Sequence, residues 1–253
     1  MSEDALTKGM GVIRKNYETS VQRGSTSPEK MAAAFSRITP TTDYSAVTDV
    51  DIVIEAIFED MTVKQALFTK LDSLAPPHTI LASNTSSLNI DEIASATARP
   101  DKVIGTHFFS PANVMKLLEN VRGAASSAET IATVMALGKT LDKVAVLAGN
   151  CDGFIGNRMF QFYNNAWEYL LEEGATPEQI DRAALSFGMA MGPAAVRDMA
   201  GLDVGVMVRK ARAPSLPKEE RISPIIERLV ERGRCGQKTG AGFYRYDGRT
   251  PVS

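Results

Sequence analysis

Several features that define whole classes of proteins are scarce or missing in this chain of 253 residues. Cys151 and Cys235 are its 2 cysteines, too few for a disulfide framework and without the spacing of metal ligands. Lys and Arg number 28 against 30 Asp and Glu, so no basic excess points to nucleic acid. No stretch approaches the roughly 18 apolar residues of a membrane span, and the N-terminus lacks the apolar run of a signal peptide. We therefore expect a globular cytoplasmic protein without nucleic-acid, membrane or metal partners.

Short apolar runs alternate with helical patterns through the first part of the chain. The runs predict strands over 51–57, 79–82, 102–109 and 143–147. Helices are predicted over the first 35 residues, with a new start at Ser27-Pro28, and then near 63–71, 90–94 and 127–139. Residues 51–57 have the pattern of a strand buried on both faces of a sheet, and Val63, Leu67 and Leu71 share one side of the helix that follows. Such alternation predicts a parallel α/β sheet.

After Gly149 the strand pattern stops, and helices are predicted over 154–173, 177–187, 193–212 and 219–233. Gly174, Gly188 and Pro214 separate them. The predicted boundary lies near residue 148, with a sheet domain over 1–148 and a helical domain over 149–253. The fold class expected is therefore α/β plus all-α.

The glycine-rich turn that normally opens a dinucleotide-binding sheet is missing before Ile52. Gly9 and Gly11 lie inside a helical pattern with no strand ahead of them, so they do not form a phosphate-binding loop. We therefore expect an incomplete Rossmann-type sheet that lacks its first βαβ unit.

The chain has 2 histidines, which limits the candidates for a general base near neutral pH. His78 follows two prolines in a turn and is expected to be a solvated loop residue. His107 lies where a predicted strand ends, and ligands of open α/β sheets bind beyond the carboxyl ends of strands. From position alone, His107 is either structural or catalytic.

Other polar residues gather near the same edge. The run 83–87, Ser-Asn-Thr-Ser-Ser, either binds a ligand or caps the helix near Ile90. Glu119 interrupts an apolar stretch, where a carboxylate either orients the histidine or belongs to a solvated face. Asn157 lies at the domain junction, where it either lines a cleft or caps a helix.

Six segments together resemble the L-3-hydroxyacyl-CoA dehydrogenases. In the order and spacing of that family, they are LASNTSSL (81–88), GTHFFSP (105–111), MKLLE (115–119), DGFIGNR (152–158), MGP (191–193) and QKTGAGFY (237–244). The resemblance runs from about residue 5 to residue 247. The segments HFFSPAN (107–113) and YDGRTP (246–251) are more similar to the dehydrogenase part of multifunctional fatty-acid oxidation enzymes, which is fused to an enoyl-CoA hydratase.

The resemblance implies four catalytic positions. His107 matches the catalytic histidine and Glu119 matches its carboxylate partner. Ser86 matches a serine that hydrogen-bonds the substrate oxygen, and Asn157 matches the asparagine that completes the site. These roles belong to the family pattern, and nothing in the spacing of the residues establishes them.

The resemblance also implies that the cofactor is NAD. Glu59, Lys64, Ser86 and Lys238 match positions that contact it. Ser110 stands where the single-function enzymes have an asparagine before the proline, so one polar contact on the nicotinamide side differs.

The implied reaction is oxidation of L-3-hydroxyacyl-CoA to 3-oxoacyl-CoA by NAD in fatty-acid β-oxidation. The partners implied are an acyl-CoA substrate and either a second copy, as a homodimer, or the rest of a larger multifunctional chain. The family's first strand, glycine-rich turn and ribose-binding acid would precede residue 1. The chain is therefore expected to be N-terminally truncated, with weak NAD binding and impaired turnover.

Two alternatives stay open. The chain is a non-catalytic dimerisation or docking module, for which the apolar-rich stretch 195–208 is suited. Alternatively, it is a different β-hydroxyacid dehydrogenase with a similar two-domain layout. Those enzymes use a catalytic lysine in the helical domain, whereas the candidate pair here, His107 and Glu119, lies in the sheet domain.

Overall fold

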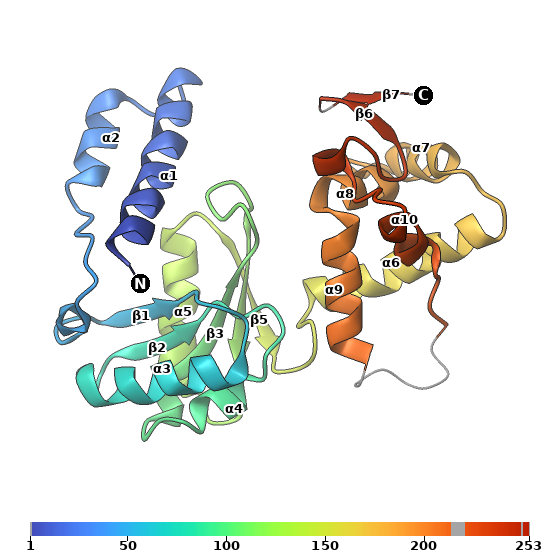
Figure 1. The fold of residues 1–253 in the computed structure, drawn as a ribbon. Helices are drawn as coiled ribbons and strands as arrows, with labels where there is room; N and C mark the ends of the chain where they lie inside the picture. Colours follow the sequence, from blue (N-terminus) through green and yellow to red (C-terminus); the bar gives the residue numbers. More distant parts are fainter. Residues whose placement is uncertain (1, 214–220, 249, 253) are drawn as a thin grey trace. The chain divides into compact units, whose positions relative to one another are not determined.

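The computed structural model describes residues 2–213, 221–248 and 250–252. The chain forms two compact units, Met1–Ile155 and Gly156–Ser253. The first unit holds a sheet and its helices, and the second is mostly helical (Figure 1). Among the described residues, no helix is long and apolar enough to cross a membrane.

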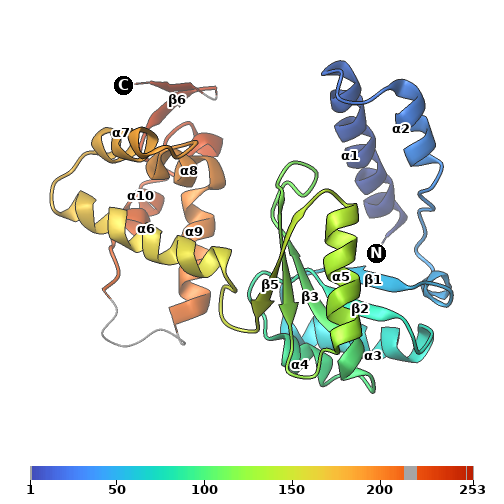
Figure 2. The same ribbon diagram turned by 180° about the vertical axis from the view of Figure 1, so that it is seen from behind.

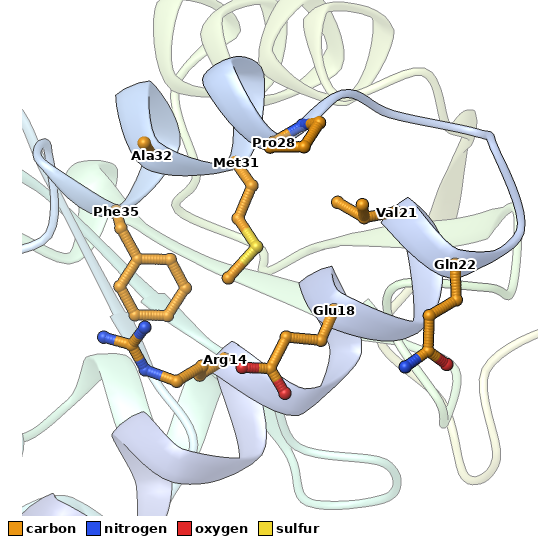
Figure 3. Close-up of a pocket in the computed structure, with 8 residues that line it drawn as sticks. All are labelled: Arg14, Glu18, Val21, Gln22, Pro28, Met31, Ala32 and Phe35. Carbon is orange, nitrogen blue, oxygen red and sulfur yellow. The ribbon is translucent and has the colours of Figure 1, made fainter.

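Two helices open the first unit and pack on each other. α1 spans Glu3–Gln22 and α2 spans Pro28–Phe35, as the sequence predicts. The Ser27 hydroxyl accepts a hydrogen bond from the N–H of Lys30 at 3.2 Å and so caps α2. Between the two helices lies a hollow of about 340 Å³ with Met31 and Phe35 on one wall (Figure 3). Neither helix has a buried residue, so both lie outside the core of the unit.

The sheet of the first unit has five strands in the order β1-β2-β3-β4-β5. Their bounds are Ile52–Glu55 (β1), Ile80–Ser83 (β2), Val103–Phe108 (β3), Leu117–Arg122 (β4) and Val144–Gly149 (β5). Neighbouring strands are parallel except β3 and β4, which are antiparallel. The mostly parallel sheet confirms the predicted fold class, but β4 is a strand that the sequence analysis did not predict.

Helices cover both faces of this sheet (Figures 1 and 2). The helices are α3 (Met61–Leu74), α4 (Ile90–Ala94) and α5 (Ala128–Thr140), with short 3₁₀ segments η1 (Tyr44–Val47) and η2 (Pro100–Lys102). α3 and α4 cover one face, where Phe68 and Ile93 pack on Leu81. α5 covers the other face, where Val134 packs on Ile104. The two apolar layers hold the strands, and hence their carboxyl ends, in place.

The first strand differs from its prediction, because β1 is not buried on both faces. Ile54 is 40% exposed. Among the described residues, β1 pairs with β2 alone and forms an edge of the sheet. An apolar run shows that residues suit burial, but it does not specify whether a helix covers each face of the strand.

The buried face of α3 also differs from its prediction. Val63, expected on that face with Leu67 and Leu71, is exposed. Lys64 is buried in its place, next to Phe68 and Leu71 on the inner face. A charged side chain on that face needs a buried partner of opposite charge, which the sequence pattern did not reveal.

The second unit contains five helices in its described residues. They are α6 (Gly156–Glu172), α7 (Pro177–Phe187), α8 (Pro193–Ala200), α9 (Leu202–Arg212) and α10 (Ile225–Glu231), followed by η4 (Gln237–Thr239). The single helix predicted over 193–212 is in fact α8 and α9. Gly201 separates them. Its φ of +95° lies outside the helical region, and glycine adopts such a conformation more readily than other residues do.

Two further predictions for the second unit were wrong. Strands do occur after Gly149, because β6 (Arg245–Asp247) and β7 (Thr250–Val252) form an antiparallel pair. Three-residue strands are too short to give a periodic signal. The helix predicted over 219–233 spans only Ile225–Glu231 in the described residues. Pro214, proposed as a separator, lies outside the described residues.

Candidate active site

β3 and β4 bring His107 against Glu119. The two residues are direct partners in the antiparallel register. His107 Nδ1 lies 2.8 Å from Glu119 Oε2. The side-chain exposure is 8% for His107 and 0% for Glu119. Because the carboxylate accepts a hydrogen bond from Nδ1, a neutral ring carries its proton there and its lone pair on Nε2.

The surroundings of the pair fix it further. The His107 ring centroid lies 4.4 Å from that of Phe109 and 5.8 Å from that of Phe154. The second oxygen of Glu119 accepts a hydrogen bond from the N–H of Ile155 at 3.1 Å. The carboxylate is therefore held at both oxygens, and the imidazole is held between a charge and two aromatic rings.

A second group of polar residues lies in the loop after β2, organised around the carboxylate of Glu59. Glu59 Oε1 accepts hydrogen bonds from the Thr85 hydroxyl at 2.6 Å and from the N–H groups of Ser86 at 2.8 Å and Ser87 at 3.2 Å. The cap of α4 is Asn89, so the run 83–87 does not serve as that cap. Thr85, Ser86 and Ser87 bind Glu59 instead.

Burial alone would raise the pKa of Glu59. The hydrogen bonds from Thr85 and Ser86, together with the charge of Lys64, outweigh burial and bring the pKa of Glu59 below its ordinary value. Glu59 is therefore an anion at neutral pH, and its side chain is 38% exposed.

Asn84 joins this loop to the strand that carries the histidine. Its side-chain oxygen accepts a hydrogen bond from the N–H of Phe108 at 2.8 Å. Its own N–H donates to the carbonyl of Glu55 at 2.7 Å. The loop that carries Ser86 is thus tied to β1 on one side and to the residue after His107 on the other.

Beneath the loop lies a buried ion pair. Lys64 Nζ is 2.7 Å from Glu55 Oε1, and each side chain is 1% exposed. The family resemblance implies that Lys64 contacts the cofactor, whereas Glu55 was not among the predicted site residues. The signal that was available is a glutamate inside the apolar run of β1, which needs a buried partner.

The other predicted site residues lie in different places. Ser110 follows the end of β3 and is exposed. Asn157 lies in the first turn of α6, and Lys238 Nζ lies 2.6 Å from Asp203 Oδ2. Asn157 and Lys238 belong to the second unit, and their roles beside His107 stay predictions. His78 is exposed, in agreement with a solvated turn.

Comparison with known proteins places this geometry in a family. Residues 1–151 match the NAD-binding domain of 3-hydroxyacyl-CoA dehydrogenase, and residues 153–246 match the C-terminal domain of the same enzyme. The chain belongs to the 3-hydroxyacyl-CoA dehydrogenase family.

Individual relatives agree with that assignment. The chain is 52% identical over 212 residues to the peroxisomal bifunctional enzyme of Cavia porcellus, covering 79% of this chain and 29% of that protein. It is 41% identical over 251 residues to the fatty acid oxidation complex subunit alpha of Psychrobacter cryohalolentis, covering 98% and 35%. The chain thus spans about a third of the length of these curated relatives.

A solved structure shows the same two-unit fold at closer to full length. It is (S)-3-hydroxybutyryl-CoA dehydrogenase from Ralstonia eutropha, 34% identical, with a TM-score of 0.90. The match covers 97% of this chain and 88% of that one. The Rossmann-type sheet and the helical C-terminal domain are therefore those of a 3-hydroxyacyl-CoA dehydrogenase.

The residues of the first unit fit one side of NAD, the cofactor of this family. Glu59 presents a half-exposed anionic carboxylate next to the loop of Ser86, where it can accept hydrogen bonds from sugar hydroxyls. A pyrophosphate prefers a helix N-terminus, but α1 begins with Glu3 and Asp4, whose charges oppose an anion there. The Glu59 carboxylate thus suits a hydroxyl-bearing part of NAD, whereas the N-terminus of α1 does not suit its pyrophosphate.

Proposed function

We propose that this chain carries out the dehydrogenase reaction of fatty-acid β-oxidation, in which L-3-hydroxyacyl-CoA and NAD give 3-oxoacyl-CoA and NADH. The observation that carries the proposal is the buried contact of 2.8 Å between His107 and Glu119. The names of two relatives, a fatty acid oxidation complex subunit and a hydroxybutyryl-CoA dehydrogenase, support the substrate class.

The mechanism follows from the atoms of the pair. Nε2 of His107 accepts the proton of the substrate 3-hydroxyl, since Nδ1 is engaged by Glu119. The imidazolium that forms is stabilised by the ionised Glu119 carboxylate. The chemistry that bound NAD would supply is that of a hydride acceptor for the hydrogen on C3. In the reverse direction His107 returns the proton to the oxygen.

Ser86 and Asn157 complete the proposed chemistry. The Ser86 hydroxyl binds the substrate oxygen, and Asn157 provides a second polar contact to it. Their contribution is orientation, because the proton and the hydride must leave in line with their acceptors. Glu59, Lys64, Ser110 and Lys238 are the proposed cofactor positions.

The test is NADH consumption with acetoacetyl-CoA, followed by absorbance, for the chain and its His107→Ala variant. We expect His107→Ala to lower kcat by about 10²–10⁴-fold, the usual contribution of general acid–base catalysis. His78→Ala is the matched control, because His78 is the other histidine and lies exposed in a turn. The proposal fails if the wild-type chain is inactive or if His107→Ala keeps its turnover.

A second candidate function is a non-catalytic dimerisation or docking role, which exposed apolar side chains favour. Met199, Val204, Met207 and Val208 are all more than 40% exposed, and they lie on α8 and α9. Large apolar patches on a surface usually mark contact with another protein. A dimer by light scattering that binds neither acetoacetyl-CoA nor NADH would favour this function over the enzyme.

Homodimer formation also fits a catalytic role, so the mass alone does not separate the two functions. We propose a homodimer of the chain, or its inclusion in a longer multifunctional protein such as the relatives.

The cytoplasmic location also stays a prediction, because relatives include enzymes named as peroxisomal and glyoxysomal. Fractionation of the source cells with an antibody to this chain is the corresponding test.

A further inference from the structure

A buried charge cluster lies below the loop of Ser86, on the side away from solvent. Lys64 is in the first turn of α3, and its Nζ contacts Glu55 at 2.7 Å and Glu59 Oε2 at 3.5 Å. Glu55 and Lys64 are almost completely buried, whereas Glu59 is half-exposed. The ammonium group is therefore enclosed between two carboxylates, and only the outer carboxylate reaches solvent.

Glu55 connects three segments of chain at this point. Its Oε1 accepts a hydrogen bond from the N–H of Ile57 at 2.6 Å, in addition to the Lys64 contact. Its Oε2 accepts one from the Ser83 hydroxyl at 2.6 Å. One carboxylate thus fixes the turn after β1, the start of α3 and the last residue of β2.

The cluster continues to the backbone that presents Ser86. Glu59 receives the N–H groups of Ser86 and Ser87, and its other oxygen faces Lys64. Asn84, in the same loop, accepts a hydrogen bond from the N–H of Phe108, directly after His107. The position of Ser86 relative to His107 is therefore set by a continuous series of contacts that starts at Glu55 and Lys64.

A buried ion pair such as Glu55 and Lys64 contributes little to the net stability of a fold. Replacing a buried ion pair by uncharged residues of similar volume is often neutral or stabilising, because burial removes the charges from water. Loops that hold reacting groups, in contrast, need fixed positions, and a misplacement of 1 Å is enough to cost about 10²-fold in rate.

We infer that Glu55 and Lys64 are positioning residues for the proposed dehydrogenase reaction, which act through Glu59 and Ser83 to hold the Ser86 loop beside His107. The inference rests on the proposed function. It gives Lys64 a role from beneath the site, in addition to the cofactor position proposed above.

The test is a double variant, Glu55→Gln with Lys64→Met, which removes both buried charges and keeps the volumes. Glu59 loses its contact with Lys64 but is 38% exposed, so its charge stays in contact with solvent. We expect kcat to fall by about 10–10²-fold from misplacement of Ser86. In a Ser86→Ala background the same double variant should lower kcat by less than about 3-fold, because interacting groups are not additive. Asp72→Asn is the matched control, since Asp72 pairs with Arg99 at the other end of α3, at 2.6 Å.

A second readout does not depend on turnover. Amide hydrogen exchange at Ser86 and Ser87 should be faster in the double variant than in wild type, while exchange in β3 and β4 stays the same. Equal losses of kcat in both backgrounds, or unchanged exchange at Ser86 and Ser87, would overturn the positioning role. An inactive wild-type chain overturns the proposed function instead, and the exchange result then decides on its own whether the pair orders the loop.

Discussion

At the scale of single residues, the proposed chemistry depends on contacts of buried charged groups. Glu119 has no exposed side-chain surface and holds His107 Nδ1 at 2.8 Å. A carboxylate in that position costs free energy unless its oxygens are bonded, and both are, to His107 and to the N–H of Ile155. The pair thus combines orientation of the imidazole with a charge that stabilises its protonated form.

We predict that Glu119→Gln lowers kcat and leaves the KM for acetoacetyl-CoA nearly unchanged. The amide keeps the size of the side chain but has no charge to stabilise the imidazolium, so the loss should be smaller than the 10²–10⁴-fold or so expected for His107→Ala. The measurement is steady-state NADH oxidation, with Glu129→Gln, at an exposed glutamate, as control.

The double variant His107→Ala with Glu119→Gln extends this prediction. Because Glu119 acts through His107, the double variant should be no slower than His107→Ala alone. Losses that multiply would show that Glu119 contributes independently of the histidine and would contradict the assigned role.

The residue scale also shows what the sequence could and could not predict of the site. His107 was a candidate from its position at a strand end. The sequence pattern alone left open whether Glu119 faces solvent, because its strand was not predicted. Only the family resemblance assigned it to the histidine. Glu55 was missed, since its role depends on Lys64, nine residues later and on a different element.

At the scale of elements, α7 was predicted to the residue, because both of its ends carry clear signals. α7 begins after Thr176, which forms a capping box with Gln179, and ends before Gly188 in the left-handed region. β4 was missed because Glu119 and Asn120 interrupt its apolar pattern, although both are buried. Burial of these polar residues is set by partners on β3 and α5, which no pattern within β4 encodes.

We predict that Gly201→Ala destabilises the second unit by about 1–3 kcal/mol, the usual cost of a strained backbone conformation. Gly201 has a φ of +95°, and an added Cβ would lie 3.0 Å from Asp203 Oδ1. The measurement is denaturant unfolding followed by fluorescence of Trp167, the one tryptophan of the chain.

Met207→Ala serves as control in the same experiment, since Met207 is exposed on α9 and surface changes usually stay within about 0.5 kcal/mol. An unfolding midpoint of Gly201→Ala equal to that of wild type would contradict the strain argument.

The Glu59 loop should respond to acid. The pKa of Glu59 lies below its ordinary 4.5 in the folded chain, so its stabilising contribution is present above about pH 4.5 and is lost as the pH falls through the lower folded value. We predict that the amide NMR signals of Ser86 and Ser87 titrate with a midpoint below 4.5 and that Glu59→Gln abolishes this titration. A midpoint at or above 4.5 would mean that the loop does not hold the carboxylate.

At the scale of the whole molecule, each unit has its own core. Phe68 and Leu81 lie in the core of the first unit, and Trp167 and Leu202 lie in cores of the second. The sequence pattern changes from alternating strands and helices to helices near residue 148, whereas the two compact units meet at Ile155 and Gly156. Sequence spacing places residues that share one helix or strand. It does not place Asn157, on α6, relative to His107, on β3.

The most direct test of the central claim is hydride transfer itself. Acetoacetyl-CoA is incubated with the chain and with NADH that carries deuterium at the transferred position, and the acyl-CoA product is analysed by mass spectrometry. We predict 3-hydroxybutyryl-CoA with one deuterium at C3, formed by the wild-type chain and strongly reduced in His107→Ala. Consumption of acetoacetyl-CoA without deuterium in the product, or equal labelling by His107→Ala, would contradict the assignment of His107 and Glu119 as the catalytic pair of a dehydrogenase.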